Sequence, residues 1–443
     1  MSHWRHAMRD ERGVATALAL FVMVIVLMLT MAFMSMAATE PQVSRNHADL
    51  IQARYVAEAG IEWAFDTLVQ TLNWSTVLQT AGGTMASSQT LPGLTIASGT
   101  FTVIARNDTQ AGDGQLTGQA LDPSGSATVD SNGTLIVTSS GTVNGVTRQI
   151  QVVIRRLQMP PFPGAVNMPG VQADTFTSSN PFQIDGRDYN RDGTLGPGPM
   201  KYGIAVQPGV QQNISPTTYE QNVEGAFNTA PKQANVMGLN QSAGGFTTGL
   251  NAIAPDASLN PTNLGSFLSQ LAASPQTTVL QSTMACPMVM TGSSADPVHP
   301  TLTNGCGVNK PLNLGTPSAP ALIYFRGDLD PSSTFTGLRA NGTVQGAGIL
   351  VIEDGDFQVF GSDFRWDGVV MVVGRYVGAG FRAGSNSTVY GAFVSEETIW
   401  NEPPGFYEFL NQGTTLTLRS SSQNINMVQN MRALHRILSW KEL

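Results

Sequence analysis

Residues 14–38 read VATALALFVMVIVLMLTMAFMSMAA, and this stretch decides the fold of the chain. It contains no ionisable side chain and no proline. An apolar helix of about 20 residues spans the hydrocarbon core of a bilayer, so this run is long enough to cross a membrane. Three arginines precede it, and basic residues favour the cytoplasmic side. We therefore predict a cytoplasmic leader over residues 1–13, a transmembrane helix over 14–38, and an extracytoplasmic remainder in a single-pass protein.

Two simpler explanations of the same run stay open. One is a cleaved secretory signal, with the small residues Ala37 and Ala38 at the cut, although its apolar region is usually only about 7–15 residues long. The other is a plain membrane anchor with no role in assembly. The residue at which the mature chain begins separates these explanations.

The helical pattern continues over residues 39–74. Pro41 lacks an N–H group and should kink or briefly interrupt the helix. Apolar residues then recur at helical spacing in two stripes: Ile51, Tyr55 and Ala59, and then Ile61, Phe65, Leu68 and Leu72. The sequence predicts one long helix that is apolar all round in its first half and amphipathic in its second.

Residues 75–157 carry strand signals. Apolar and polar residues alternate over 98–106, 127–139 and 142–156, and Ser140-Gly141 between the last two is a turn signal. A helix that is apolar on one face needs a sheet to bury that face. We predict an antiparallel sheet covered by the amphipathic helix, hence an α+β fold.

A proline-rich boundary at Pro160, Pro161 and Pro163 opens a β-rich region over 158–423. Apolar runs opened by a small residue recur there at Gly348, Gly368 and Gly391, with an earlier member at Ala321. Such runs, each followed by a Gly-rich turn, suit the stacked parallel coils of a β-solenoid. An ordinary β-sandwich with coincidental spacing is the alternative. The tail over 424–443 has helical period and is predicted to dock as a helix.

Composition restricts the function. The 443 residues carry a formal net charge of −8, which disfavours a nucleic-acid binder. No nucleophile elbow, phosphate loop or zinc-protease motif is present, and the five histidines are scattered. The best catalytic candidates are four clustered carboxylates, as solenoid glycosidases use such groups: Asp354, Asp356, Asp363 and Asp367. Because solenoid turns are often acidic without chemistry, we predict that the protein is not an enzyme.

One segment resembles a calcium-binding loop. Its D-x-N-x-D-G spacing places oxygen side chains at alternate positions before a glycine that permits a sharp turn, which suits hard Ca²⁺. The candidate ligands are Asp185, Asp188, Asn190, Asp192 and Thr194. The last loop position is Pro199 instead of a bidentate Glu, so a further ligand must come from elsewhere. The alternative is an Asx-rich turn without metal, and no other cofactor is expected.

The chain has two cysteines, Cys286 and Cys306, in a Pro- and Gly-rich stretch. Outside the cytoplasm such a pair favours one disulfide. In a reducing compartment they would stay free thiols. The sequence lacks the paired spacing of a zinc site.

These features together resemble type IV pilin-like proteins. Arg12-Gly13 before the apolar run resembles the end of a prepilin leader, which prepilin peptidase would cut between Gly13 and Val14. The apolar run and the AEAGIE segment, with Ala57, Glu58, Ala59 and Gly60, resemble the N-terminal domain of PilX-type minor pilins. The resemblance implies insertion in the bacterial inner membrane, helices that pack with those of other pilins and minor pilins, and a pilus or cell-surface location after assembly.

Leu18 departs from the major-pilin pattern. It stands at the fifth position after the cut, where major pilins carry a glutamate that pairs with a neighbour's amino terminus. An apolar residue avoids a buried charge but loses that pairing. The resemblance then implies a minor pilin that acts in tip building, priming or adhesion to a surface or glycan ligand. The alternatives are a pseudopilin of a type II-like secretion system, or a membrane-anchored glycan-binding or glycan-cleaving solenoid.

Overall fold

The computed structural model describes residues 4–90, 99–178, 181–211, 217–240, 252–328, 336–382, 384–399, 407–412 and 415–443. The chain forms two compact units. The first holds residues up to Leu68 with Asn73–Ile154 and Ile437–Leu443, and the second holds Val69–Leu72 with Arg155–Arg436.

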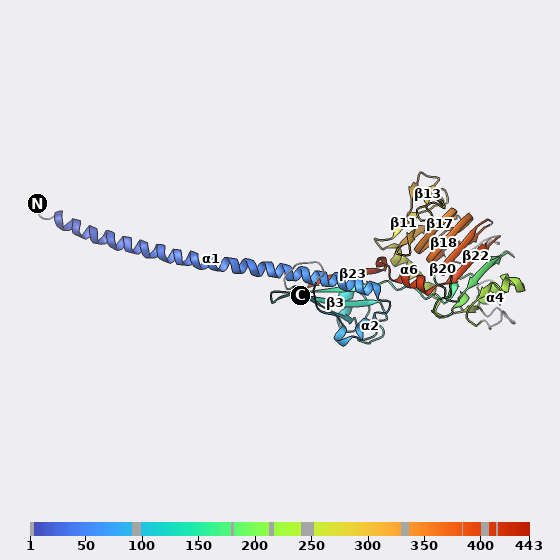
Figure 1. Ribbon diagram of the computed structural model, residues 1–443, viewed down its shortest axis with the longest axis horizontal. Coiled ribbons are helices and arrows are strands. Elements are labelled where there is room, and N and C mark those ends of the chain that lie inside the picture. The colour runs from blue at the N-terminus through green and yellow to red at the C-terminus, as the bar shows by residue number, and fades with distance from the viewer. Residues whose placement is uncertain are drawn as a thin grey trace. The chain divides into compact units, whose positions relative to one another are not determined.

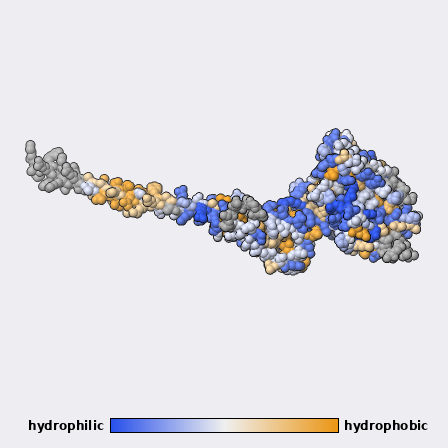
Figure 2. Space-filling model, in the orientation of Figure 1, coloured by the Kyte–Doolittle hydropathy of each residue, from blue (hydrophilic) through white to orange (hydrophobic). Residues whose placement is uncertain are grey.

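The first unit contains most of one helix, α1 (Trp4–Gln70), which is 67 residues long (Figure 1). Pro41 lies inside α1, and the predicted interruption there does not occur. A proline removes only its own N–H bond, so the turns on both sides can continue. Figure 2 shows the apolar residues as a hydrophobic band along the first half of α1. The predicted long helix is confirmed.

An antiparallel sheet packs against the second half of α1. Its strands follow the order β1 (Thr84–Thr90), β2 (Thr100–Asn107), β3 (Thr134–Val143), β4 (Val146–Arg156) and β23 (His435–Glu442). Short helical turns accompany it: α2 (Ser75–Leu78), η1 (Ala81–Gly83) and α3 (Asp113–Thr117). The helix face toward the sheet is fully buried and consists of small or aliphatic residues: Ala53, Val56, Ala57, Ile61, Ala64 and Leu68. The α+β class is confirmed.

The predicted turn at Ser140-Gly141 is wrong. Both residues lie inside β3, and the chain reverses at Asn144-Gly145, where both residues have positive φ. Two residues with positive φ form the hairpin turn that matches the twist of antiparallel strands, and Asn-Gly is the pair that adopts it most readily. Gly141 serves another purpose. A Cβ there would fall on the Ala53 carbonyl oxygen and the Ala57 nitrogen of α1.

The C-terminal tail is helical over only part of the predicted range. Helix α7 covers Ser422–Gln429, a 3-10 turn η2 covers Arg432–Leu434, and strand β23 follows. The apolar tail residues that are buried are Val428, Met431 and Leu434, whereas Leu438 in β23 is exposed. The helical periodicity of the tail therefore corresponds to only one short helix. The prediction is wrong for the end of the tail, which is a strand at the edge of the first unit's sheet.

The second unit is built mainly from strands that stack in parallel (Figure 1). Its strands are β5 (Gly164–Met168), β6 (Thr175–Thr177), β7 (Phe182–Asp185), β8 (Tyr202–Val206), β9 (Val236–Met237), β10 (Ile253–Pro255), β11 (Thr278–Gln281), β12 (Met288–Gly292), β13 (Thr301–Asn304), β14 (Asn309–Pro311), β15 (Gly315–Thr316), β16 (Ala319–Arg326), β17 (Thr336–Glu353), β18 (Asp356–Gly374), β19 (Ala379–Phe381), β20 (Asn386–Glu397), β21 (Phe409–Asn411) and β22 (Thr415–Ser420). Its other helices are α4 (Tyr219–Ala226), α5 (Ala230–Gln233) and α6 (Pro261–Ala272).

The repeat seen in the sequence sets the register of this stack. Ala321, Gly348, Gly368 and Gly391 are direct partners on successive parallel strands β16, β17, β18 and β20. The coils therefore stack as a solenoid, and parallel pairing excludes an antiparallel sandwich for these strands. Chain order and stack order differ, because β20, β21 and β22 pair with the much earlier β5, β6 and β7.

Two apolar clusters explain why the repeated runs are apolar throughout. One cluster fills the space inside the coils and includes Phe325, Ile352, Val372 and Phe393. The intervening residues of the same strands face outward, where helix α6 and the chain around α7 cover them in a second cluster. A strand buried on both faces reads as a continuous apolar run, as these do.

Candidate functional site

The first half of α1 exposes its apolar side chains. In this chain all residues from 14 to 37 are exposed, and Leu18 is among them. The stripe continues on the amphipathic half, where Ile51 is 42% exposed and Tyr55 60% exposed. Contiguous apolar surface of this kind marks a membrane or protein contact. The helix is long and apolar enough for a single membrane span.

The residues named for processing and assembly divide between two surroundings. Gly13 and Val14 lie within α1, and the Val14 side chain is exposed. Ala57 and Gly60 are buried against the sheet of the same unit, where a Cβ on Gly60 would meet the Ser139 hydroxyl. Glu58 pairs with Arg54 at 3.0 Å, and Ala59 is half-buried. The AEAGIE segment therefore packs against the sheet of its own unit.

The predicted calcium ligands do not converge as one set. Both oxygens of buried Asp185 accept bonds from Arg187, and Tyr189 donates to Oδ2 at 2.7 Å, so Asp185 belongs to an ion pair. Asp188 accepts from the Ser422 nitrogen and hydroxyl and from the Gly198 nitrogen. These donors already occupy the oxygens that a cation would need.

The rest of the loop forms local turns. Asp192 accepts from the nitrogen and the hydroxyl of Thr194, and the Asn190 amide donates to Thr194 Oγ1 at 3.1 Å. In the described part of the chain no three His, Cys, Asp or Glu side chains are grouped to hold a metal. Calcium stays a prediction of the motif alone, and the hydrogen bonds support the Asx-turn alternative. A melt of the wild-type chain in excess Ca²⁺ separates the two, because only bound ion raises Tm.

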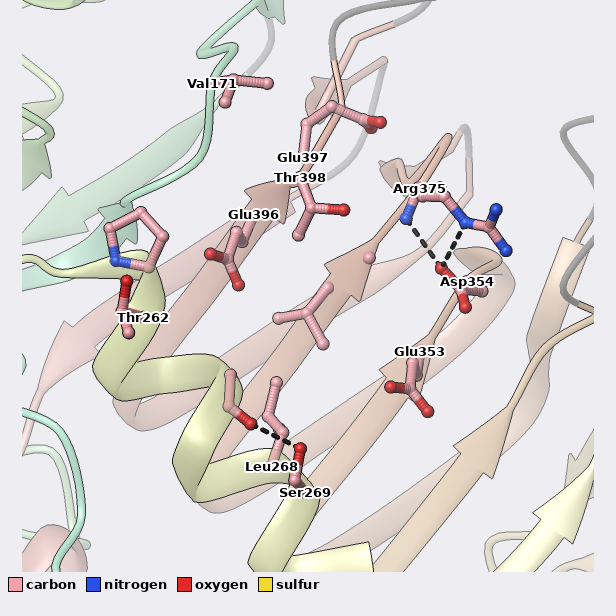
Figure 3. Close-up of a pocket in the computed structure, with 14 residues that line it drawn as sticks. Val171, Thr262, Leu268, Ser269, Glu353, Asp354, Arg375, Glu396, Glu397 and Thr398 are labelled. Carbon is pink, nitrogen blue, oxygen red and sulfur yellow. Dashed lines mark hydrogen bonds and ion pairs between the residues drawn. The ribbon is translucent and has the colours of Figure 1, made fainter. Parts of the chain in front are cut away.

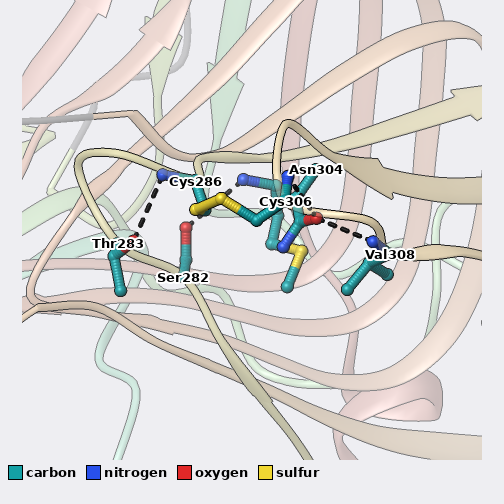
Figure 4. The surroundings of a disulfide bond; sticks show 7 residues. Ser282, Thr283, Cys286, Asn304, Cys306 and Val308 are labelled. Atoms are coloured by element: carbon teal, nitrogen blue, oxygen red, sulfur yellow. Dashed lines mark hydrogen bonds between the residues drawn. A yellow bond between two sulfur atoms is a disulfide. The ribbon is translucent and has the colours of Figure 1, made fainter.

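The structure joins Cys286 and Cys306 in a disulfide, with Cα atoms 5.7 Å apart (Figure 4). The bridge ties the chain before β12 to the turn between β13 and β14. Backbone N–H groups next to it donate to side chains of the same loops, with Cys306 bonded to Asn304. The bridge thus restrains these two loops relative to each other.

The four carboxylates considered for catalysis have separate partners. Asp363 accepts a bond from Asn386 at 2.9 Å, and Asp367 pairs with Arg365 at 3.2 Å. Burial raises the pKa of Asp356 to about 7, and Gln358 is its hydrogen-bond donor. Asp354 lies elsewhere, at the end of β17, where it accepts from the Arg375 nitrogen. No shared catalytic pair emerges from these four.

Asp354 belongs to a cleft that local sequence patterns do not reveal. The cleft, of about 490 Å³, lies between α6 and the ends of β17, β18 and β20 (Figure 3). Its acidic residues are Glu353, Asp354, Glu396 and Glu397. Glu353 and Glu396 occupy the same outward row, because both are in register with Val373 between them. Both continue the apolar outer row of side chains that α6 covers. Glu396 is therefore buried although it is a carboxylate.

Burial dominates the electrostatics of the cleft. It raises the pKa of Glu396 to about 7, with no opposing hydrogen bond. It raises the pKa of Glu397 to about 8, although the Tyr376 and Val377 nitrogens donate to that carboxylate at 2.7 and 2.9 Å. The pKa of Asp354 is raised for the same reason. A carboxyl group without a partner resists ionisation because its charge would be poorly solvated.

This raised pKa predicts a loss of stability with increasing pH. Between about 4.5 and about 7 the folded chain keeps the Glu396 proton while the unfolded chain has released it. Stability from this group is complete below that range and lost as pH rises through it, by roughly 3 kcal/mol at most. We expect Glu396→Gln to remove this part of the slope when Tm is followed from acid to neutral pH.

The matched control is Glu353→Gln. Glu353 lies in the same cleft but is already paired with Arg326 at 3.1 Å. The remaining charged neighbours, Asp354, Glu397 and Arg375, are common to both variants. The pH slope should survive in Glu353→Gln, and an undiminished slope in Glu396→Gln would contradict the assignment.

Comparisons with known proteins identify no family for this chain. No protein-family model matches the sequence, and no curated protein is significantly similar to it. Among solved structures, the chain is similar to the competence-associated pilin ComZ from Thermus thermophilus, at 11% identity and a TM-score of 0.22. That match covers 89% of this chain and 98% of the other.

The class of the protein therefore comes from its own architecture. It joins one exposed apolar helix, long enough for a membrane span, to a helix-on-sheet unit and a unit of stacked parallel coils.

Proposed function

We propose that this chain is a minor pilin of a type IV pilus, anchored in the inner membrane before it enters the filament. The observation that carries the proposal is α1, whose first half is exposed and apolar while its second half is held by the unit's own sheet. A helix of that kind can lie in lipid and later exchange lipid for the helices of other pilins without changing the fold of the unit that holds it.

The apolar stripe on the amphipathic half supports the same proposal. Ile51 and Tyr55 leave an apolar surface outside the length needed for a bilayer. A plain anchor has no use for that surface, whereas a helix bundle of several subunits would cover it. Leu18 favours a low-copy subunit, and the coils of the second unit would then be presented outward for adhesion or tip building.

A charge in the apolar run tests the proposal. Leu27→Arg places a cation near the middle of the span, where insertion scales assign about 2.5–3.5 kcal/mol. We expect less of the variant in the membrane and a loss from sheared filaments. Gln52→Arg is the control, because it adds the same charge at an exposed, already polar position of α1. A filament fraction that keeps Leu27→Arg at the wild-type level would contradict the proposal.

The mature N-terminus, measured by mass spectrometry, separates the alternatives. A chain that begins at Val14 supports cleavage after Gly13 by prepilin peptidase. A chain that begins at Thr39 indicates ordinary secretion, and an intact Met1 indicates a simple anchor. A secretion pseudopilin would share the Val14 start, and it would differ by loss of secretion without loss of pili when the gene is deleted.

A further inference from the structure

We propose that the cleft between α6 and the ends of β17, β18 and β20 binds a primary alkylammonium group, as carried by a lysine side chain or a small diamine. The cleft contains a carboxylate with an oxygen atom that has no partner in the described chain. Glu396 is only 1% exposed, lines the cleft, and its Oε1 atom has no hydrogen-bond partner (Figure 3). A buried polar atom normally has a partner, so a missing one points to a group from outside.

The charges around Glu396 favour a cation. Two of the four acidic side chains form ion pairs with arginines: Glu353 with Arg326 at 3.1 Å, and Asp354 with Arg375 at 3.8 Å. The carboxylate of Glu397 instead accepts two backbone N–H groups. The Oε1 atom of Glu396 has no described cation or N–H donor as a partner. A ligand that brings positive charge and hydrogen-bond donors would complete this arrangement, whereas an anion would meet four acidic groups.

The donor set suits an organic cation better than a metal ion. Ca²⁺ takes six to eight oxygen ligands, and no three acidic side chains described here are grouped to hold a metal. An ammonium group needs fewer partners because it carries its own three donors. The walls of the cleft include Val171, Leu268 and Val373, which can pack along an alkyl stem while its charged end reaches Glu396.

Gly265 keeps the cleft open. It lies within α6 and lines the cleft, and a Cβ built there would meet nothing within 4 Å. Glycine weakens a helix interior relative to alanine, and here no close contact requires it. Because Gly265 has no side chain, the cleft keeps space for a ligand at this position. A larger side chain at this position should fill the cleft without disturbing the fold.

The experiment uses the full chain in neutral maltoside micelles. Cadaverine and lysine amide are titrated by calorimetry at about pH 7, with pentanediol and Nε-acetyl-lysine amide as uncharged counterparts. We expect saturable binding of at least one amine and none of its counterpart. Because the pKa of Glu396 is about 7, binding should also release a fraction of a proton, which is measured by repeating the titration in buffers of different ionisation heat.

Two variants place the site. Glu396→Gln should weaken amine binding at least about tenfold, since a charge-assisted hydrogen bond is lost. Gly265→Leu should weaken it similarly by filling the cleft. Gly225→Leu is the matched control, because Gly225 is also an exposed helical glycine with open space, in α4, and it should bind as the wild type does.

The outcomes decide both the proposal and the source of the ammonium group. Binding of lysine amide alone indicates a side chain from a partner protein, and binding of cadaverine alone indicates a free amine; either supports the site. No saturable heat with either amine overturns it. Unchanged affinity in Glu396→Gln or in Gly265→Leu overturns it too, since binding would then lie elsewhere.

Discussion

Replacing Gly368 by alanine should destabilise the second unit strongly and increase the local opening of its stacked coils. Gly368 lies inside β18, where it pairs with Gly348 of β17 on one side and Gly391 of β20 on the other. Its φ of +142° is a backbone conformation almost restricted to glycine. A Cβ there would fall on the carbonyl oxygen of Gly348 and within 3.0 Å of that residue's nitrogen. The obstacle is backbone of the neighbouring coil, so no side chain can move aside.

The expected loss is roughly 4 kcal/mol, from backbone strain and overpacking together. That is a large part of the total stability of an ordinary domain, about 5–15 kcal/mol. Hydrogen exchange of the full chain in micelles, measured by mass spectrometry, should show lost protection in peptides from β16–β20. Peptides from β2–β4 of the first unit should exchange as before, which identifies the loss as local.

Gly361→Ala is the matched control. Gly361 lies in the same strand and also has a positive φ, of +52°, but a Cβ there would meet nothing within 4 Å. Alanine at Gly361 then costs only left-handed strain, about 1–2 kcal/mol. If the two variants exchanged alike, the close approach of successive coils at Gly368 would not be a determinant of the fold.

The same glycines show which parts of the fold the sequence could predict. Gly348, Gly368 and Gly391 recur because the backbone of each coil approaches the preceding coil closely at this position, so a local repeat predicts the register of a non-local ladder. The apolar runs after them are buried on both faces, and that burial is also visible as an uninterrupted pattern. The long helix could be predicted for the same reason, since lipid or neighbours must cover its whole circumference.

The failures arise where a local signal had two physical meanings. Ser140-Gly141 resembles a turn, but Gly141 is small because a helix passes over it, and the more specific Asn144-Gly145 pair makes the turn. The tail has helical spacing, yet its end forms strand β23 because an edge of the sheet was available. The sequence shows that a residue is small or that apolar residues recur at helical spacing. Only the tertiary packing shows which neighbouring element makes that residue or spacing necessary.

The cleft could not be predicted from sequence because its parts meet through stacking. Glu396 follows an apolar run near the end of β20, so the sequence alone suggests that its side chain is exposed to solvent. Helix α6, which buries it, comes more than a hundred residues earlier, and nothing local records that contact. A carboxylate in the same row as buried valines is the one signal that could have marked the site, once the register of β20 on β18 was known.

Replacing Gly141 by valine should separate α1 from the sheet of the first unit. The added Cβ would fall on backbone atoms of Ala53 and Ala57 and lie 3.0 Å from the Ala57 Cα atom. Only a shift of the whole helix could make room, and that shift would open the buried row of Ala53, Ala57 and Ile61. We expect a loss of about 3 kcal/mol, at the upper end of ordinary overpacking.

Ser140→Val provides the control, because Ser140 is the preceding residue of β3 and its side chain lies on the other face, bonded to Gln149. Valine there suits a strand and should change stability by no more than about 0.5 kcal/mol. Hydrogen exchange should increase in the second half of α1 and in β3 only for Gly141→Val. Because α1 is the segment proposed to carry assembly, that variant should also be depleted from filaments although it remains in the membrane. Normal incorporation of Gly141→Val, despite a detached helix, would show that the head does not need to hold α1 for the subunit to assemble.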